Sequence, residues 1–332
     1  MGKILIIAEA GVNHNGDINL AHRLIDAAKN SGADIVKFQI GKPENVVSRF
    51  AKKAEYQKRN TGYRESQLDM VRKITLSFDL FKELKKHCEN VGIGFLSTPF
   101  DMESVDFLQK LGCDLWKIPS GEITNYPYLV RIAETGKNII LSTGMCRMDE
   151  IEASYRILRE KGSGKISLLH CTTQYPAPFE SVNLRAMLAL KDKFQCPVGY
   201  SDHTVGSEIS VAAAALGASI LEKHFTLDRN MEGPDHKASL EPDELAMMIA
   251  QVRNVEIALG DGEKRPANEE LSNLAVVRKS IVARRDIRKG EIFSVENITT
   301  KRPGDGISPM RWNEILGMKA VKDFSEDALI EL

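Results

Sequence analysis

The stretch Gly199-Tyr-Ser-Asp-His-Thr204, together with its echo Leu221-Glu-Lys-His-Phe-Thr226, decides the fold. In each stretch a short apolar run ends and a histidine follows, His203 in the first and His224 in the second. Between them, Glu208–Leu216 is a run of small residues that predicts a helix closed by a glycine. Strand, helix and strand in this order form a parallel α/β unit. Its two strands point the same way, so both histidines lie at the same end of the sheet.

The two histidines are candidate metal ligands. Two neutral imidazoles that converge on one point, with carboxylates nearby, can hold a divalent cation. The alternative is that each histidine ends its strand and bonds only to backbone. For a single histidine this alternative is the better interpretation, but a pair at matching strand ends favours the metal. We therefore expect His203 and His224 to bind a divalent metal.

Composition and charge exclude several classes of function. The 332 residues carry a formal net charge of −1, which gives no case for nucleic acid or an anionic membrane as a partner. No apolar run approaches the roughly 20 residues that span a bilayer, and Met1 leads into a strand without a signal-peptide pattern. The five cysteines are an odd number without CxxC spacing, which is typical of reduced thiols. We expect a cytoplasmic protein.

Apolar strands alternate with amphipathic helices from the start of the chain. Continuous Ile, Val and Leu runs indicate strands that are buried on both faces. Roughly eight such strand–helix repeats favour a closed (β/α)8 TIM barrel over an open sheet. The expected strands are Ile4–Ala8, Asp34–Lys37, Gly94–Ser97, Leu115–Ile118, Asn138–Ser142, Lys165–Leu169, Pro197–Tyr200 and Ala218–Leu221.

One polar stretch interrupts this alternation. Lys42–Lys73 follows the second strand and is rich in charge. An insertion of that length after a strand is usually functional or mobile.

The character of the chain changes after the barrel. Gly260–Pro266 breaks the pattern and indicates a linker, and the segments that follow predict short strands and turns. We expect a barrel domain over residues 1–258, a linker over 259–275 and a small β-rich domain over 276–332. A domain of that size has a thin core and leans on a partner surface for stability.

Polar residues gather at the C-terminal ends of the expected strands, where TIM barrels carry their catalytic groups. Two lysines beside several hydroxyls suit an anion such as phosphate or carboxylate. The alternative is that Lys37 and Lys117 extend past the rim to water. Because a buried lysine without a partner is costly, we favour the anion. The full set is Glu9, Lys37, Thr98, Lys117, Ser120, Glu122, Ser142, Thr173, Tyr175, Ser201, His203, His224 and Asp235.

The roles of the two glutamates stay open at this point. Glu9 and Glu122 face the same region as the lysines. Each can act as an acid or base, or can form an ion pair with a lysine. The sequence does not decide between these roles.

Ten short motifs are spread along nearly the full length of the chain: Ile6–Gly16, Val36–Gln39, Leu96–Phe100, Trp116–Glu122, Leu141–Met145, Leu169–Pro176, Tyr200–Thr204, Glu222–Thr226, Gly233–Asp235 and Thr300–Gly304. In this order they resemble the bacterial sialic acid synthases, the family that makes N-acetylneuraminic, legionaminic and pseudaminic acids. The last segment resembles the antifreeze-protein-like (SAF) domain of that family.

The resemblance implies a reaction: phosphoenolpyruvate condenses with an open-chain N-acetylated hexosamine to give a nine-carbon 2-keto acid and phosphate. It also implies a divalent metal, Mn²⁺ or Mg²⁺, held by His203 and His224. Glu122 then corresponds to a carboxylate beside the reacting carbons. The phosphoenolpyruvate contacts correspond to Lys37, Thr98, Lys117, Ser120, Ser142 and Ser201, and the sugar contacts to Glu9, Tyr175 and Asp235.

Two further expectations come from the resemblance. Some relatives have asparagine where Thr173 stands; a threonine hydroxyl can still donate to the phosphate there, with a shorter reach. Family members are domain-swapped homodimers, in which an arginine of the partner's small domain reaches the N-acyl group of the sugar. Arg302 corresponds to that arginine.

Four other functions compete with an N-acetylneuraminate synthase that uses N-acetylmannosamine. The nearest is an N,N'-diacetyllegionaminate synthase that uses 2,4-diacetamido-2,4,6-trideoxymannose. A class I aldolase needs a single Schiff-base lysine, and the paired histidines and separate lysines argue against it. A deoxy-octulosonate or deoxy-heptulosonate synthase needs arginines for a second phosphate, which the strand ends lack. A non-catalytic carbohydrate-binding protein of polysaccharide assembly would not keep so many titratable groups at the strand ends.

Overall fold

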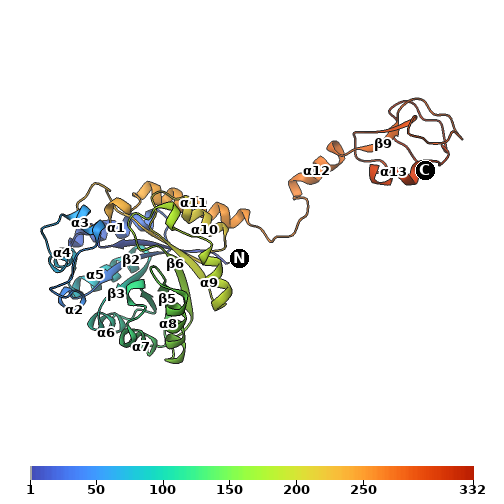
Figure 1. Cartoon of the computed structure of the whole chain (residues 1–332). Helices are drawn as coiled ribbons and strands as arrows, with labels where there is room; N and C mark the ends of the chain where they lie inside the picture. The colour runs from blue at the N-terminus through green and yellow to red at the C-terminus, as the bar shows by residue number, and fades with distance from the viewer. Residues whose placement is uncertain (1) are drawn as a thin grey trace. The chain divides into compact units, whose positions relative to one another are not determined.

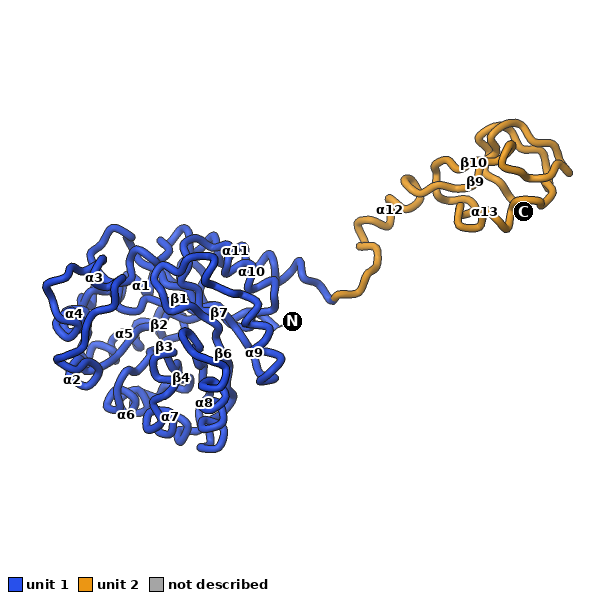
Figure 2. The backbone as a smooth tube through the Cα atoms, viewed as in Figure 1, with its two compact units in different colours: residues 1–261 blue, residues 262–332 orange. Residues whose placement is uncertain are grey.

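The computed structural model describes residues 2–332, which divide into two compact units. The first unit ends at Asp261, and the second covers Gly262–Leu332 (Figure 2). Each unit has a hydrophobic core of its own, as separate domains do.

Eight parallel strands form the sheet of the first unit (Figure 1). Hydrogen-bonded neighbours follow the order β3-β2-β1-β8-β7-β6-β5-β4. The two strands at the ends of this order, β3 and β4, lie against each other and close the sheet. The predicted (β/α)8 barrel is therefore confirmed. The strands are β1 (Leu5–Gly11), β2 (Ile35–Ile40), β3 (Gly94–Pro99), β4 (Leu115–Ile118), β5 (Asn138–Ser142), β6 (Ile166–Cys171), β7 (Val198–Asp202) and β8 (Ile220–His224).

Helices with buried apolar faces cover the outside of the barrel (Figure 1). Asp17 and Asp101 begin two of them, because each carboxylate accepts a hydrogen bond from a backbone N–H of the first turn. The helices are α1 (Ile18–Asn30), α5 (Phe78–Val91), α6 (Met102–Lys110), α7 (Tyr126–Ala133), α8 (Met148–Glu160), α9 (Ala186–Phe194), α10 (Glu208–Ala215) and α11 (Pro242–Ala258), with short 3-10 turns η1 (Ser120–Glu122), η2 (Phe179–Ser181) and η3 (His236–Ala238).

The interior of the barrel has an apolar layer below a polar one. Ile7, Leu96, Ile140, Leu169 and Ile220 form a buried cluster contributed by five strands. Alternate residues of a strand face the same side, so the residue two positions further on faces the same interior, one layer nearer the C-terminal ends. Those residues are Glu9, Thr98, Ser142, Cys171 and Glu222, all buried.

The polar insertion seen in the sequence forms the roof segment (residues 42–75), with helices α2 (Pro43–Val46), α3 (Glu55–Thr61) and α4 (Gln67–Ile74). Asn60 Nδ2 donates to Pro234 O at 2.7 Å, which ties α3 to the loop after β8. Gly16, in the loop after β1, has a φ of +75° and lies so near Lys73 O that a Cβ would be 2.6 Å from it. The roof segment is thus attached to loops at the C-terminal ends of two barrel strands.

The second unit is built around a two-stranded antiparallel sheet, β9 (Ser280–Ala283) and β10 (Ile298–Lys301). Its core includes Ile281, Phe293 and Phe324. Helix α12 (Asn268–Val277) begins inside the stretch predicted as a linker and ends two residues beyond it. Its first turn carries acidic residues that favour a helix start. Two short helices follow: η4 (Pro309–Arg311) and α13 (Trp312–Ile315).

An ion pair on the outer side of the strands stabilises the end of the barrel near α10. Lys223 Nζ lies 3.0 Å from Asp202 Oδ2, and both side chains are 0% exposed. The lysine also donates to Thr204 O at 2.6 Å, and the carboxylate accepts from Ser210 Oγ at 2.6 Å. Each charge is therefore paired and hydrogen-bonded, which burial requires.

We predict that Lys223→Met lowers the free energy of unfolding by about 3–5 kcal/mol, because Asp202 is left as a buried charge without its cation. Lys137→Met is the matched control: Lys137 pairs with Asp114 on the surface, where both side chains are solvated, and should change stability little. Urea unfolding followed by circular dichroism measures both variants. Equal midpoints for the two variants would contradict the prediction.

Candidate active site

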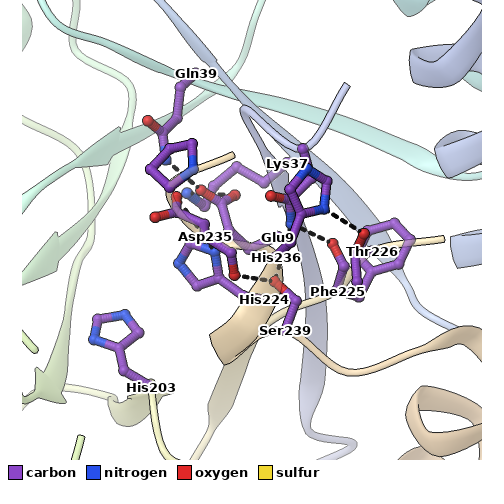
Figure 3. Close-up of polar contacts among 12 residues, drawn as sticks. Glu9, Lys37, Gln39, His203, His224, Phe225, Thr226, Asp235, His236 and Ser239 are labelled. Atoms are coloured by element: carbon purple, nitrogen blue, oxygen red, sulfur yellow. Dashed lines mark hydrogen bonds and ion pairs between the residues drawn. The ribbon is translucent and has the colours of Figure 1, made fainter. Parts of the chain in front are cut away.

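Four charged side chains meet inside the barrel at the strand ends. Lys37 Nζ lies 2.7 Å from Glu9 Oε2 and 3.7 Å from Glu222 Oε2. Lys117 Nζ lies 3.5 Å from the other oxygen of that bridging carboxylate, Glu222 Oε1. Both lysines are 3% exposed, so they do not extend past the rim to water. Figure 3 shows Lys37 beside Glu9, with Gln39 donating to the second oxygen of Glu9 at 2.8 Å.

Burial and pairing act in opposite directions on these four groups. Burial raises the pKa of Glu9 despite its contact with Lys37. Burial also acts to raise the pKa of Glu222, but Lys117 and Lys37 outweigh it and hold that pKa at about 2. The pKa of Lys37 is raised, since its two carboxylates overcome burial, whereas burial lowers the pKa of Lys117. Two lysines share the one ionised carboxylate of Glu222, and this arrangement favours an incoming anion.

Three hydroxyl groups surround the lysines. Lys117 Nζ donates to Ser142 Oγ at 2.7 Å, and Lys37 Nζ donates to Thr98 Oγ1 at 3.3 Å. Ser201 Oγ donates to the bridging carboxylate at 2.9 Å. The hydroxyls and the ammonium groups together offer several donors to one anion.

The rim of the site carries two further hydroxyls. Ser120 Oγ and Thr173 Oγ1 are 3.5 Å apart. Glu122, at the other end of η1, accepts a hydrogen bond from Asn125 Nδ2 at 2.5 Å and does not line the cavity at the strand ends. The structure thus brings Ser120 and Thr173 to the site and leaves the Glu122 carboxylate in a local contact outside it.

His203 and His224 lie side by side, with ring centroids 5.4 Å apart. His203 Nδ1 donates to Thr172 O at 2.6 Å, which fixes the tautomer and leaves Nε2 as the atom with a lone pair. His224 Nδ1 is buried without a hydrogen-bond partner. Burial lowers the pKa of both histidines to about 3, so both rings are neutral, as metal ligands must be.

The two histidines fit the predicted metal in tautomer, charge and position, but they make an open site. Within residues 2–332, no group of three or more His, Cys, Asp or Glu side chains is arranged to hold an ion. A metal held by the two histidines would need oxygen atoms of substrate or water to complete its coordination shell.

Tyr175 and Asp235 border the histidines. The Tyr175 ring lies 4.2 Å from the His203 ring and 5.5 Å from the His224 ring, measured between centroids. Asp235 Oδ2 lies 4.0 Å from His224 Nδ1 (Figure 3). Burial, with a smaller contribution from the charge of Glu9, raises the pKa of Asp235 to about 7. This carboxyl can exchange a proton close to neutral pH.

A cavity of about 320 Å³ connects all these groups, and every site residue predicted in the barrel lines it except Glu122. Arg302 belongs to the second unit, where its Nε donates to Val277 O at 3.0 Å.

Sequence reasoning missed Glu222, which holds the two lysines. The signal was present: Glu222 stands two residues before His224 on β8, so strand alternation places both side chains on the same interior face. Gln39, which binds Glu9, was missed in the same way, two residues after Lys37 on β2. The roof residues of the cavity gave no such signal, because they lie in a stretch without strand periodicity.

A family model described as the NeuB family matches residues 24–264, and an SAF domain model matches residues 278–331. The chain belongs to the NeuB family. It is 59% identical to the N,N'-diacetyllegionaminic acid synthase of Campylobacter jejuni over 99% of both chains. It is 46% identical to the enzyme of the same name from Legionella pneumophila, over 96% of this chain and 91% of that one. The predicted family and the SAF domain are therefore confirmed.

A solved structure is similar in both sequence and fold. It is the N-acetylneuraminic acid synthetase of Leptospira borgpetersenii in complex with citrate. The identity is 37% and the TM-score 0.74, over 82% of this chain and 90% of that one. The wider family thus includes synthases for more than one nine-carbon acid.

We predict that Lys117→Met raises the KM for phosphoenolpyruvate by about 10- to 150-fold, because a charge-assisted contact to a buried anion contributes roughly 1.5–3 kcal/mol. Lys37→Met should act in the same direction. Binding of Mn²⁺ should hardly change, since neither lysine can be a ligand. Lys137→Met, a surface substitution of the same type, is the control for kinetics. An unchanged KM in both site variants would show that the lysines serve only the internal carboxylates.

Proposed function

We propose that this chain is an N,N'-diacetyllegionaminic acid synthase, which joins phosphoenolpyruvate to 2,4-diacetamido-2,4,6-trideoxymannose and releases phosphate. One observation carries the choice of sugar: the 59% identity to a synthase of that name, compared with 37% to an N-acetylneuraminic acid synthetase. The sequence alone had favoured N-acetylmannosamine as the substrate, and the comparisons favour the alternative.

The lysines and hydroxyls of the floor supply the site for phosphoenolpyruvate. Lys37 and Lys117 stand on opposite sides of Glu222, so one substrate can bring its phosphate to one cation and its carboxylate to the other. Thr98, Ser142 and Ser201 add donors around them. Held in this way, the enol carbon is kept in a fixed direction for bond formation, which lowers the entropic part of the barrier.

The two histidines would hold the metal, and when bound it supplies Lewis-acid polarisation of the sugar aldehyde. The histidines contribute by staying neutral and fixed: Thr172 O orients His203, and burial keeps both rings unprotonated. Tyr175 covers both rings and limits the access of water.

Two carboxyl groups of the cavity can hold protons beside the reacting carbons. Burial raises the pKa of Glu9 and of Asp235, while Glu222 stays ionised between the lysines. Either group, in its ionised form, can take the proton of the water that adds before phosphate leaves. Glu122 is the less suited candidate, because its carboxylate is bound to Asn125 outside the cavity. The domain-swapped homodimer, with Arg302 of the partner chain over the sugar, stays a prediction.

Removal of metal should abolish the reaction, and added Mn²⁺ or Mg²⁺ should restore it. His203→Ala should also lose Mn²⁺ binding in electron paramagnetic resonance titrations while keeping its circular dichroism spectrum. His87→Ala, which alters a surface histidine paired with Asp26, is the matched control and should bind Mn²⁺ normally. Full activity of a chelator-treated, metal-free sample would contradict the proposal that the two histidines hold a metal needed for the reaction.

The choice of sugar is tested by phosphate release from phosphoenolpyruvate with each sugar in turn. We expect kcat/KM for 2,4-diacetamido-2,4,6-trideoxymannose to exceed that for N-acetylmannosamine by at least about tenfold, because a site built for an acetamido group leaves polar atoms unpaired with the analogue that lacks it. Equal or reversed values of kcat/KM for the two sugars would favour an N-acetylneuraminate synthase instead. No release with either sugar would favour a carbohydrate-binding protein.

A further inference from the structure

The cavity has a charged floor and a wall of mixed polarity on the side of the roof segment. The floor is made by the strand ends, with their lysines, hydroxyls and histidines. The roof segment contributes to the wall five apolar side chains, Val46, Val47, Met70, Val71 and Ile74, and four with polar groups, Tyr56, Gln57, Gln67 and Thr75. Val47 is 7% exposed and Met70 is 3% exposed, whereas Val46 is 36% exposed.

Helix α4 presents one face to the cavity. Its lining residues Gln67, Met70, Val71 and Ile74 follow the i, i+3, i+4, i+7 spacing of a single helical face. The side-chain amide of Gln67 thus stands one turn before Met70 and Val71 on the same face of the helix. The charged residues of α4 that do not line the cavity, among them Asp69, are exposed. The apolar face gives this otherwise polar segment a surface to bury against the barrel.

The wall is fixed in position. The Tyr56 ring of α3 lies 5.1 Å from the Tyr175 ring, which covers the histidines. Asn60 donates to the loop after β8, and the backbone carbonyl of Lys73 packs closely against Gly16 in the loop after β1. A wall held at three points can discriminate by shape and polarity, because it does not retreat from a poorly matching group.

The chemistry of the sugar decides which of its atoms meet the wall. The aldehyde carbon must lie at the floor, where the histidines and the phosphoenolpyruvate site are. C6 is then five carbon–carbon bonds of about 1.5 Å away, roughly 6 Å in an extended chain. In an extended chain, C6 is thus the carbon of the sugar that lies farthest from the floor.

We propose that the roof wall, and Val47 and Val71 in particular, selects sugars with a methyl group at C6 over sugars with a hydroxymethyl group there. This inference rests on the proposed function, because it explains how a 6-deoxy substrate is chosen. A methyl group gains contact with the wall. A hydroxyl held against Val47 or Val71 loses its hydrogen bonds to water and finds no partner in either side chain.

The expected discrimination is bounded by what an apolar pocket can do. Such a pocket rejects an analogue that adds a hydroxyl by up to about 100-fold. We therefore expect wild-type kcat/KM for 2,4-diacetamido-2,4,6-trideoxymannose to exceed that for its 6-hydroxy analogue by about 10- to 100-fold. The same ratio should appear for 2-acetamido-2,6-dideoxymannose compared with N-acetylmannosamine, a pair without the acetamido group at C4.

Val71→Thr and Val47→Thr test the wall with a change that keeps the shape of the side chain and adds a hydroxyl. Each should lower the 6-deoxy to 6-hydroxy preference by about threefold to tenfold, the value of one hydrogen bond. The KM for phosphoenolpyruvate should stay unchanged. Val91→Thr is the matched control: it is a half-buried valine at the end of α5 that does not line the cavity, and its preference should equal that of the wild type.

The two sugar pairs separate the failure of this inference from the failure of the proposed function. Suppose that the wild type prefers the 4-acetamido sugar, and that the wild type and its three variants all show the same 6-deoxy preference. This result would overturn the role of the wall and leave the proposed function standing. An enzyme without a preference for the 4-acetamido sugar would overturn the proposed function. In that case, a 6-deoxy preference in the second pair that falls in the threonine variants would still support the wall. If one threonine variant does not fold, the other decides.

Discussion

The site depends on one carboxylate held between two lysines inside a closed barrel. Glu222 contacts Lys37 from β2 and Lys117 from β4, and each of the three side chains is at most 5% exposed. Any one of these charges alone would be too costly to bury. Both ammonium groups line the cavity, where they can attract an anionic substrate. The contacts that allow these charges to be buried therefore also build the proposed anion site.

Strand register brings these groups to one level. Glu9 is the register partner of Lys37 on one side and of His224 on the other, and Ser201 is the partner of Glu222. Because side chains alternate along each strand, the apolar cluster around Ile7 fills the layer below. The polar layer thus rests on a packed floor, which holds its distances without help from a ligand.

Much of this was predictable from the sequence, and the limits have physical causes. Parallel strands end at one edge, so strand-end residues such as Lys117 and His203 could be assigned without a structure. The partner of a buried lysine could not, because the contact between Lys117 and Glu222 crosses the barrel and leaves no spacing in the sequence. Glu122 was placed among the reacting groups by analogy, whereas its local hydrogen bond to Asn125 depends on the geometry of η1. Hydrophobic periodicity was enough to predict the barrel. The structure of the roof segment depends on tertiary contacts, which the sequence pattern does not show.

Under the proposed function, chemistry and choice of substrate reside in different parts of the chain. The strand ends would hold the enol phosphate and the aldehyde, so those motifs point to the reaction and do not distinguish one sugar from another. In the proposed binding mode, the far end of the sugar meets the roof segment instead. Helix α4 contributes single side chains to that wall, such as Val71, which lie outside the barrel strands. Substitution there can change the sugar without disturbing the charged floor, because the two regions are attached through loops and share no ion pair among the interactions described for the floor lysines. A family with one chemistry and several sugar substrates is what such a division of labour allows.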